Sequence, residues 1–464
     1  MVRSRGTGCA PEQPSTNHTG AEGDDNDDSN GKDKPRFTPW SQIRATVFNS
    51  RINVLLVASP IGIAISYAKI SPVAVFVVNF IAIIPLAAML SYATEEIAKR
   101  TGEVLGGLLN ASFGNAVELI VSIIALTKGQ VLIVQTSLIG SMLSNLLLVL
   151  GMCFFFGGVN RVEQAFNMTV AQTASSLLFL AVSSLIIPTA FEAWAKTGSD
   201  NTSSTTAATT DSTQSPKPGV AALSRGTAIL LLIVYACYLF FQLKSHAEMY
   251  KKLGDKSETR DVSTKFKNAV IPEKLRRRTP QELEAATPEP VEEKPQEPQL
   301  SLWVAVFTLA VSTVLVALNA EYLVDSINSI TCGGGISKSF VGLILLPIVG
   351  NAAEHATAVT VAIKDKMDLA IAVAVGSSMQ IALLVLPLVV VLGWIIGKDD
   401  MTLYFDEFQI AVLFVAVLLV NYLIQDGKSN WLEGVLLMVL YIIIAVAAWF
   451  YPPAPGLSDC PAGK

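Results

Sequence analysis

Eleven long apolar blocks are the feature that most restricts what this chain can fold into. A helix that crosses the hydrocarbon core of a bilayer needs about 20 predominantly apolar residues. Hydrophobic residues make up 51% of the 464 positions and charged residues 15%, against roughly 25% charged residues in soluble domains. We therefore expect an all-α integral membrane protein with 11 transmembrane helices. The blocks cover residues 52–69, 72–98, 103–126, 131–156, 167–191, 221–243, 301–328, 338–363, 369–396, 406–424 and 431–451.

The distribution of Lys and Arg predicts how these helices are oriented, because basic loops stay on the cytosolic side. Basic residues follow the helices that have even numbers in chain order, and loops after odd-numbered helices carry fewer. We therefore expect a cytosolic N-terminus and a C-terminus on the opposite side of the membrane. The basic residues after even-numbered helices are Lys99, Arg100, Arg161, Lys244, Lys251, Lys252, Arg276, Arg277, Arg278, Lys364 and Lys366.

The polar segments divide the chain into regions. A disordered cytosolic leader precedes a first helix, and a cytosolic linker separates two sets of five helices. A short tail follows on the non-cytosolic side. The predicted regions are the leader 1–45, the first helix 46–70, the first set 71–244, the linker 245–300, the second set 301–451 and the tail 452–464.

Two polar segments have open interpretations. The acidic segment 282–297 of the linker fits a solvated spacer, and it also fits a surface that concentrates cations near a pore. Its acids are Glu282, Glu284, Glu289, Glu292, Glu293 and Glu297. The Ser/Thr-rich loop 197–217 contains a glycosylation sequon at Asn201, on the side where glycosylation occurs. An unmodified flexible loop fits this segment equally well.

A short motif is repeated in the two five-helix sets. Gly114–Glu118 reads GNAVE and Gly350–Glu354 reads GNAAE. Each Glu is followed 22 residues later by Gly-Ser, ending at Ser141 and Ser377. Because five is an odd number, the second set enters the membrane from the opposite side. We therefore predict one extra N-terminal helix plus two inverted-topology five-helix repeats, a construction typical of secondary transporters, with the two motifs antiparallel near the midplane.

The two glutamates of this motif predict the chemistry. A charged carboxylate near the bilayer centre costs about 2.5–3.5 kcal/mol on insertion scales, and Glu118 and Glu354 would also repel each other. The pair can share protons, bind a divalent cation, or pair with basic side chains. The helices that carry them have no Lys or Arg in their interior, which leaves proton uptake and cation binding. These are the two half-reactions of a cation/proton antiporter.

The neighbouring residues fit an oxygen-rich cation site. Ca²⁺ takes six to eight oxygen ligands from carboxylates, amides, carbonyls and water. The Gly-Asn pairs would loosen each helix and expose backbone carbonyls, and Pro347 strengthens this expectation for the second motif. The alternative for the small residues is close helix packing. The candidate ligands besides Glu118 and Glu354 are Gly114, Asn115, Gly350, Asn351, Ser377 and Gln380, with Ser141 and Ser144 as further candidates.

Three residues are candidates for proton coupling. His355 directly follows Glu354, and a histidine titrates in the range suited to proton handling; Leu119 stands at the equivalent place in the first motif. Glu95 and Glu321 lie near opposite faces of the membrane, where they fit either proton-relay groups or ordinary interfacial acids. Glu96 and Asp325 are weaker candidates of the same kind.

These motifs resemble those of the CAX family of Ca²⁺/H⁺ exchangers, in particular its fungal vacuolar type, within the larger cation/Ca²⁺ exchanger superfamily. The resemblance implies one extra helix plus two inverted repeats, with Glu118 and Glu354 as central Ca²⁺ ligands. It places Asn115, Asn351 and Gln380 nearby and His355 beside the site. It also implies an acidic segment between the halves. The residues that carry it are IAIIPLAAMLSYATEEIA (81–98), GGLLNASFGNAVELIVSIIAL (106–126), GSMLSNLLLVLG (140–151), VGLILLPIVGNAAEHATAV (341–359) and AVGSSMQIALLVLP (374–387).

The resemblance also implies a function. The expected activity is low-affinity-type antiport by alternating access, in which cytosolic Ca²⁺ enters the vacuole as H⁺ leaves it. Ca²⁺ and H⁺ are then transported ions, with no cofactor and no nucleic-acid partner. The predicted orientation suits a vacuolar membrane.

Other functions remain as alternatives. One alternative is a Na⁺/Ca²⁺ exchanger of the same superfamily. The sodium-driven members resemble a different repeat, with Gly-Thr-Ser and Pro before the acid, and its absence from this chain counts against this alternative. A Mn²⁺/H⁺ exchanger fits because Mn²⁺ also accepts oxygen ligands, and a passive Ca²⁺ channel would also suit a buried Glu pair. An intramembrane aspartyl protease would need Tyr-Asp and Gly-x-Gly-Asp inside helices, and neither is present, so we expect no enzyme. Stoichiometry and oligomeric state stay open.

Overall fold

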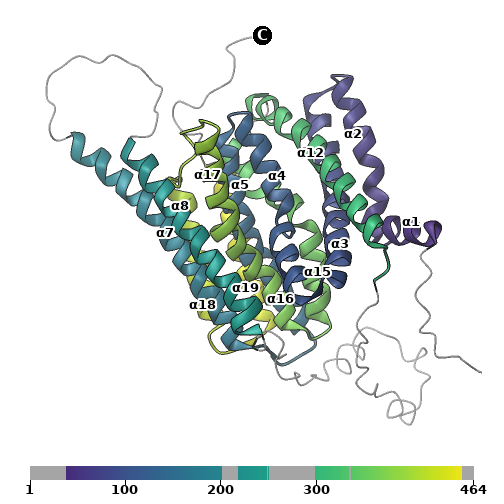
Figure 1. Cartoon of the computed structure of the whole chain (residues 1–464). Helices are drawn as coiled ribbons and strands as arrows, with labels where there is room; N and C mark the ends of the chain where they lie inside the picture. Colours follow the sequence, from purple (N-terminus) through teal and green to yellow (C-terminus); the bar gives the residue numbers. More distant parts are fainter. Residues whose placement is uncertain (1–37, 201–217, 248, 250–297, 334–335, 452–464) are drawn as a thin grey trace, which may run out of the picture.

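The structure, a computed structural model, describes residues 38–200, 218–247, 249, 298–333 and 336–451. Figure 1 shows a bundle of long helices that run side by side, with α1 lying across one end of α2 and α12. The helices are α1 (Pro39–Val47), η1 (Arg51–Val57), α2 (Ala58–Tyr67), α3 (Pro72–Phe113), α4 (Ala116–Thr127), α5 (Val131–Leu143), η2 (Ser144–Val149), α6 (Leu150–Gly158), α7 (Met168–Asp200), α8 (Pro218–Phe240), η3 (Phe241–Ser245), α12 (Leu302–Gly333), α13 (Lys338–Phe340), η5 (Val341–Leu345), α14 (Leu346–Gly350), α15 (Ala352–Ile363), α16 (Met367–Gln380), η6 (Ile381–Val385), α17 (Leu386–Ile395), α18 (Glu407–Leu423) and α19 (Trp431–Phe450).

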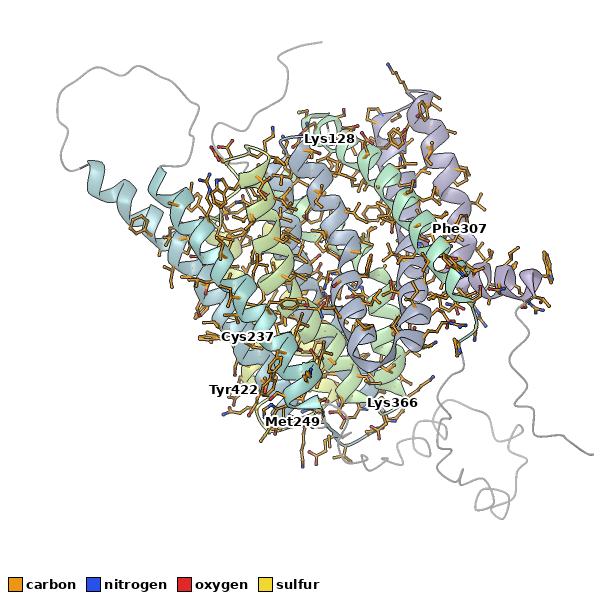
Figure 2. The ribbon with its side chains drawn as sticks, in the orientation of Figure 1. Lys128, Cys237, Met249, Phe307, Lys366 and Tyr422 are labelled. Atoms are coloured by element: carbon orange, nitrogen blue, oxygen red, sulfur yellow. The ribbon has the colours of Figure 1, made fainter. Side chains whose placement is uncertain are left out.

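The described residues form a multi-span membrane protein that is almost entirely helical. Within the described ranges, seven helices are long and apolar enough to cross a membrane, and the number rises to nine if each of two bent pairs is one span. In Figure 2, Lys128 and Lys366 stand at opposite ends of the bundle, and Phe307, 69% exposed, lies on its outer side. Apolar side chains on the outside of a bundle are expected where lipid is the solvent.

The number of spans by length and composition falls short of the eleven predicted. Two of the predicted blocks correspond to shorter apolar helices, α4 with 12 residues and α18 with 17. Both are shorter than the roughly 20 residues that a perpendicular span needs. For α4 the reason is local, because the chain breaks at Gly114-Asn115 and only the part after the break belongs to this helix.

Helix α3 is longer than predicted. The basic pair Lys99 and Arg100 indicated a loop between helices at 72–98 and 103–126, but α3 continues through it to Phe113. The charges are accommodated on the helix itself, since Lys99 forms ion pairs with Glu95 and Glu96 one turn earlier. Pairs at this spacing stabilise a helix, so a basic pair does not by itself end one.

Helix α1 corrects the extent of the predicted leader. Residues 39–45 were expected to be disordered, whereas they are helical, with Thr38 as the N-cap and Pro39 in the first turn. Trp40 is 75% exposed, while Gln42 is buried. The helix meets the following span at 94°, as expected for an amphipathic helix that lies in the membrane interface.

One small sheet departs from the all-α prediction. Strand β1 (Gln164–Ala165) pairs antiparallel with β2 (Lys428–Ser429), with Gln164 opposite Ser429. These residues precede α7 and α19. The sheet joins two loops at one end of the bundle, close to where α6 and α19 pack together.

The two halves interlock in a reciprocal manner. Helix α3 packs along α12, α6 along α19, and α8 along α17. The most deeply buried segments are α5 with η2 and α16 with η6, the helices that follow the two motifs. The π-helical segments η2 and η6 stand at equivalent places in the two halves, and such turns occur frequently at functional sites.

Several predicted regions lie outside the described residues. They are the leader up to residue 37, most of the Ser/Thr-rich loop with Asn201, the acidic segment with its six glutamates, and the tail 452–464.

Candidate cation site

Both motif helices break at the predicted Gly-Asn pairs. Helix α3 ends at Phe113 and α4 begins at Ala116, while α14 ends at Gly350 and α15 begins at Ala352. The second break bends the chain by 57°. Each glutamate consequently lies in the first turn of a new helix, where the helix dipole favours negative charge. The breaks confirm the prediction that Gly-Asn interrupts these helices.

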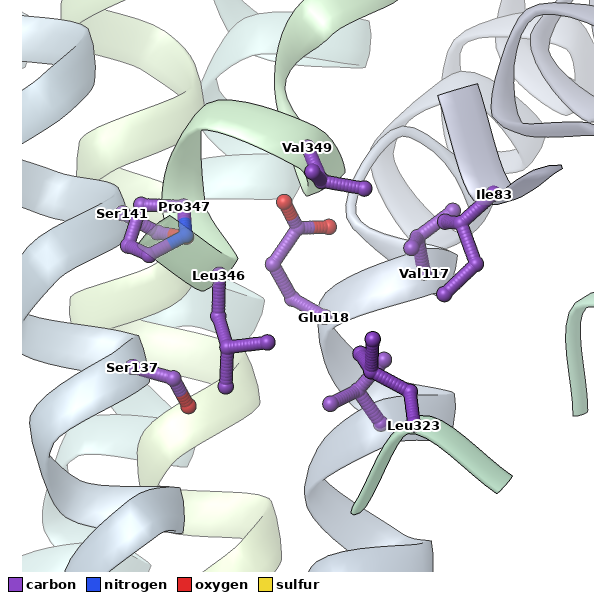
Figure 3. A pocket seen from close by; sticks show the side chains of 11 residues that line it. Ile83, Val117, Glu118, Ser137, Ser141, Leu323, Leu346, Pro347 and Val349 are labelled. Carbon is purple, nitrogen blue, oxygen red and sulfur yellow. The ribbon is translucent and has the colours of Figure 1, made fainter. Parts of the chain in front are cut away.

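The side chain of Glu118, which follows the first break, reaches the second break. Its Oε1 atom would be 2.8 Å from a Cβ atom at Gly350, so only glycine leaves room for the carboxylate there. Ser141 and Pro347 also line the small cavity of about 30 Å³ that contains Glu118, large enough for a water molecule or an ion. Figure 3 shows the carboxylate pointing toward the turn that carries Val349.

Close helix packing brings Ser141 into this cavity. A Cβ atom on Gly140 would clash with the carbonyl oxygen of Leu343, so the backbones of α5 and η5 touch where they cross. Gly376, the equivalent residue of the second half, has open space around its Cα. The packing alternative for the small residues therefore holds for Gly140 and does not hold for Gly376.

Glu354 and His355 lie at the start of α15, and both side chains are partly accessible. The carboxyl group of Glu354 lies near the carboxyl group of Glu118 and near Ser377. The Nε2 atom of His355 is 3.3 Å from Oγ of Ser144. The structure thus brings together both glutamates, the histidine, Ser144 of the first half and Ser377 of the second.

Amide and hydroxyl groups form a chain of hydrogen bonds across the two halves. Asn145 Nδ2 donates to Ser377 Oγ (3.1 Å), and Ser377 Oγ donates to Asn115 Oδ1 (2.7 Å). Asn115 Nδ2 in turn donates to Gln380 Oε1 (2.8 Å). Sequence reasoning identified Asn115, Ser377 and Gln380 but missed Asn145, which has Ile381 at the equivalent place of the second half and so gave no repeat signal.

Several oxygen atoms at this centre lack hydrogen-bond partners. Among the buried side-chain atoms of the described residues, Glu118 Oε1, Glu354 Oε2, Asn145 Oδ1 and both polar atoms of Asn351 are unpartnered. Buried polar groups are ordinarily paired, and each exception needs an explanation. Unpaired carboxylate and amide oxygens are the ligands that a hard cation requires.

The donor set restricts which cations fit. No cluster of three or more His, Cys, Asp or Glu side chains suited to a metal ion is found in the part of the chain that the structure describes. A cation between Glu118 and Glu354 would therefore have two carboxylates and otherwise neutral oxygens. That composition suits Ca²⁺ or Mn²⁺ and does not suit metals that prefer thiolate or imidazole.

Glu95 and Glu321 lie outside this constellation. Glu95 is largely exposed and forms an ion pair with Lys99 (3.1 Å). Its neighbour Glu96 is fully buried and accepts hydrogen bonds from the backbone of Gln299 (2.6 Å) and Leu300 (2.9 Å). Glu96 therefore holds the start of α12 against α3. The sequence did not predict this structural role, because it indicated Glu96 only as a weaker candidate for proton coupling.

Glu321 takes part in a contact at the opposite end of α12. Lys128, which follows α4, lies 3.4 Å from the Glu321 carboxylate and 2.5 Å from that of Asp325. All three side chains are partly or largely exposed. The structure thus ties the helix that carries Glu118 to α12 by an ion pair, and it does not place Glu321 beside the central glutamates.

Comparison with known proteins identifies the family. The family model described as "Sodium/calcium exchanger protein" matches residues 71–244 and 304–450. The chain belongs to this family. Members of the sodium/calcium exchanger family are transporters, in agreement with the prediction that the chain is not an enzyme. The resemblance derived from the motifs is confirmed at the level of the family.

Three similar proteins are informative. The chain is 44% identical to the "Vacuolar calcium ion transporter" of Cryptococcus neoformans, over 89% of this chain and 76% of that protein. It is 41% identical to the "Ca(2+)/H(+) antiporter" of Aphanothece halophytica, over 86% and 96% of the two chains. A crystal structure of the Ca²⁺/H⁺ antiporter protein YfkE shares 32% identity with a TM-score of 0.63, over 86% and 99%.

Proposed function

We propose that this exchanger-family protein is a Ca²⁺/H⁺ antiporter of the vacuolar membrane, with Glu118 and Glu354 as the carboxylates that bind Ca²⁺ and H⁺ in turn. The observation that carries the proposal is the pair of unpartnered carboxylate oxygens at two helix breaks 236 residues apart. Two carboxylates match the charge of one divalent cation, and two protons restore neutrality after its release. The similarity to vacuolar calcium transporters and Ca²⁺/H⁺ antiporters supports the ions and the compartment.

The proposal includes an eleven-helix topology. The segment η1–α2 is the extra helix, the region from α3 to α8 is the first repeat, and the region from α12 to α19 is the second. Two observations support it: the reciprocal packing of α6 with α19 and of α17 with α8, and the equivalent π-helical segments after each Gly-Ser. An inverted repeat would let the site open to either side by alternating access, with the N-terminus cytosolic and the C-terminus lumenal.

The other oxygen ligands would come from the breaks and from the opposite half. Ser141 lines the cavity that contains Glu118, and Ser377 lies near Glu354. Gln380 is hydrogen-bonded to Asn115, and Asn351 lies at the second break. His355 would handle protons beside Glu354, in contact with Ser144.

The test is ⁴⁵Ca²⁺ uptake into proteoliposomes that contain the purified full-length protein. We expect uptake when the interior is acidic, without Na⁺, and collapse of uptake when an ionophore dissipates the pH gradient. Glu118→Gln and Glu354→Gln should each abolish it. Uptake that requires a Na⁺ gradient would instead identify a Na⁺/Ca²⁺ exchanger, and uptake independent of both gradients would identify a channel. Preference for ⁵⁴Mn²⁺ under the same gradient would identify a Mn²⁺/H⁺ exchanger.

A further inference from the structure

The two motif asparagines occupy equivalent places in the sequence but have unlike surroundings in the structure. Asn115 has both amide atoms engaged, its Oδ1 by Ser377 and its Nδ2 by Gln380. Asn351 is completely buried, and neither of its amide atoms has a partner among the described residues. A symmetric site with two equal amide ligands is therefore not what the structure contains.

The sequence explains the difference. The residues that hold Asn115 come from the second half, and their equivalents 236 positions earlier are Ser141 and Ser144. A serine is shorter than the glutamine at residue 380, and Ser144 Oγ contacts His355 instead. Asn351 consequently lacks a hydrogen-bond partner like the Gln380 side chain that holds Asn115.

Asn145 adds a direction to the chain of hydrogen bonds. It is buried in the first turn of η2 and donates to Ser377 Oγ, so that this oxygen is already an acceptor. The single hydroxyl proton of Ser377 is then donated onward, and Asn115 Oδ1 receives it. The carboxyl group of Glu354 also lies near Ser377, but the hydrogen bond from this hydroxyl goes to Asn115.

The direction of these hydrogen bonds decides which amide oxygen is free to bind a cation. An amide oxygen has two lone pairs, so one that already accepts a strong hydrogen bond has fewer to offer than one with both lone pairs free, and Ca²⁺ is bound through the lone pairs of its oxygen ligands. Asn351 Oδ1 is free and buried next to the break that carries Glu354. Asn115 instead acts as a strut between the first break and α16, because its two bonds reach Ser377 and Gln380 of that helix.

We propose that Asn145 is a positioning residue that makes the site asymmetric: it orients Ser377 toward Asn115, so that Asn351, and not Asn115, is the motif asparagine that supplies an amide ligand to the cation. This inference rests on the proposed function only in taking a divalent cation as the substrate. It assigns different roles to two residues that the repeat makes look alike, and it adds a residue that has no counterpart in the second half.

The transport test compares Asn351→Ala, Asn115→Ala and Asn145→Ala in the proteoliposome assay. The control is Ser183→Ala, a partly exposed residue of α7 whose hydroxyl bonds only to the backbone of its own helix among the described contacts. Asn351→Ala should raise the KM for Ca²⁺ at least tenfold. Asn115→Ala and Asn145→Ala should lower the maximal rate about fivefold to tenfold and change KM less than threefold. Both variants weaken the hydrogen bonds between the first break and α16, but they keep Asn351 as the amide ligand. Equal effects of Asn115→Ala and Asn351→Ala on KM, or an Asn145→Ala protein like wild type, would overturn the proposal.

A double-mutant cycle separates positioning from general damage. Asn145→Ala combined with Asn115→Ala should be no slower than the worse single variant, because both break one chain. Asn145→Ala combined with Asn351→Ala should show the product of the two effects. Multiplying effects in the first pair would contradict a shared chain.

A binding test keeps this inference distinct from the proposed function. The purified full-length protein is heated with and without CaCl₂, and its unfolding temperature is measured. We expect Ca²⁺ to stabilise wild type and Asn145→Ala, and to lose its effect on Asn351→Ala; loss in Asn145→Ala as well would refute the division of roles. If Ca²⁺ stabilises wild type but no pH-driven uptake occurs, the proposed function fails while this inference is still decided. Asn351→Ser and Asn145→Ser replace any alanine variant that is unfolded without Ca²⁺.

Discussion

The carboxylate of Glu118 lies against the Cα atom of Gly350, the residue at which the second motif helix breaks. The first half of the chain thus inserts its glutamate into the gap that the second half leaves open. Two features of the repeated motif that seemed separate in the sequence, the acid and the glycine, are complementary parts of one contact.

Gly350→Ala should impair transport more than folding. The new Cβ atom would stand 2.8 Å from Glu118 Oε1, and this atom is the mobile end of a side chain, which can turn away. We expect at least a tenfold loss of ⁴⁵Ca²⁺ uptake with little change in unfolding temperature. Gly226→Ala, with open space around it on α8, is the matched control. Normal uptake by Gly350→Ala would mean that the position of Glu118 is not critical.

Gly140→Ala should have the opposite effect and impair folding. Its Cβ atom would clash with the Leu343 carbonyl oxygen and would lie 2.6 Å from Pro347 Cγ, and a backbone atom cannot turn away as a side chain can. Overpacking of this kind costs about 1–3 kcal/mol. The measurement is thermal unfolding of the purified protein. Gly376→Ala is the control, and an equal loss of stability in both variants would contradict the close crossing of α5 and η5.

Sequence reasoning reached the helical membrane fold and the centre of the site because both depend on patterns that the chain repeats. Apolar length predicts helices whatever their packing, and the G-N-A-x-E repeat locates both breaks. Asn145 was missed because it acts through Ser377, which lies 232 residues away in the sequence, and because its equivalent in the second repeat is Ile381. No periodicity in the sequence records a contact of that kind.

The adjacent acids Glu95 and Glu96 show a second limit. Successive residues of a helix point about 100° apart, so one of two neighbouring acids is buried and the other exposed, and the sequence does not say which. The sequence favoured Glu95, whereas the structure buries Glu96.

Replacing Glu96 should destabilise the protein, whereas replacing Glu95 should not. Glu96 accepts two backbone hydrogen bonds at the start of α12 while fully buried, and hydrogen bonds to charged groups contribute about 1.5–3 kcal/mol. Glu95 forms an exposed ion pair, of the kind that contributes about 0–1 kcal/mol. We expect Glu96→Gln to lower the unfolding temperature clearly below that of Glu95→Gln. A stable Glu96→Gln protein would rule out the anchoring role, and a stable but inactive Glu95→Gln protein would support a relay role for Glu95.

The ion pairs of Lys128 decide between two roles for Glu321. If Glu321 is mainly a structural partner, Glu321→Gln should keep uptake within about twofold of wild type, because Asp325 still holds Lys128 at 2.5 Å. The double change Glu321→Gln with Asp325→Asn removes both partners and should slow uptake several-fold, since α4 then loses its tie to α12. High salt should reproduce part of this loss in wild type, because exposed ion pairs are screened.

If Glu321 is a proton relay, Glu321→Gln alone should cut uptake at least tenfold and change its dependence on external pH, with Asp325→Asn as the inert control. Measuring initial uptake rates of the three variants across a pH series separates these outcomes.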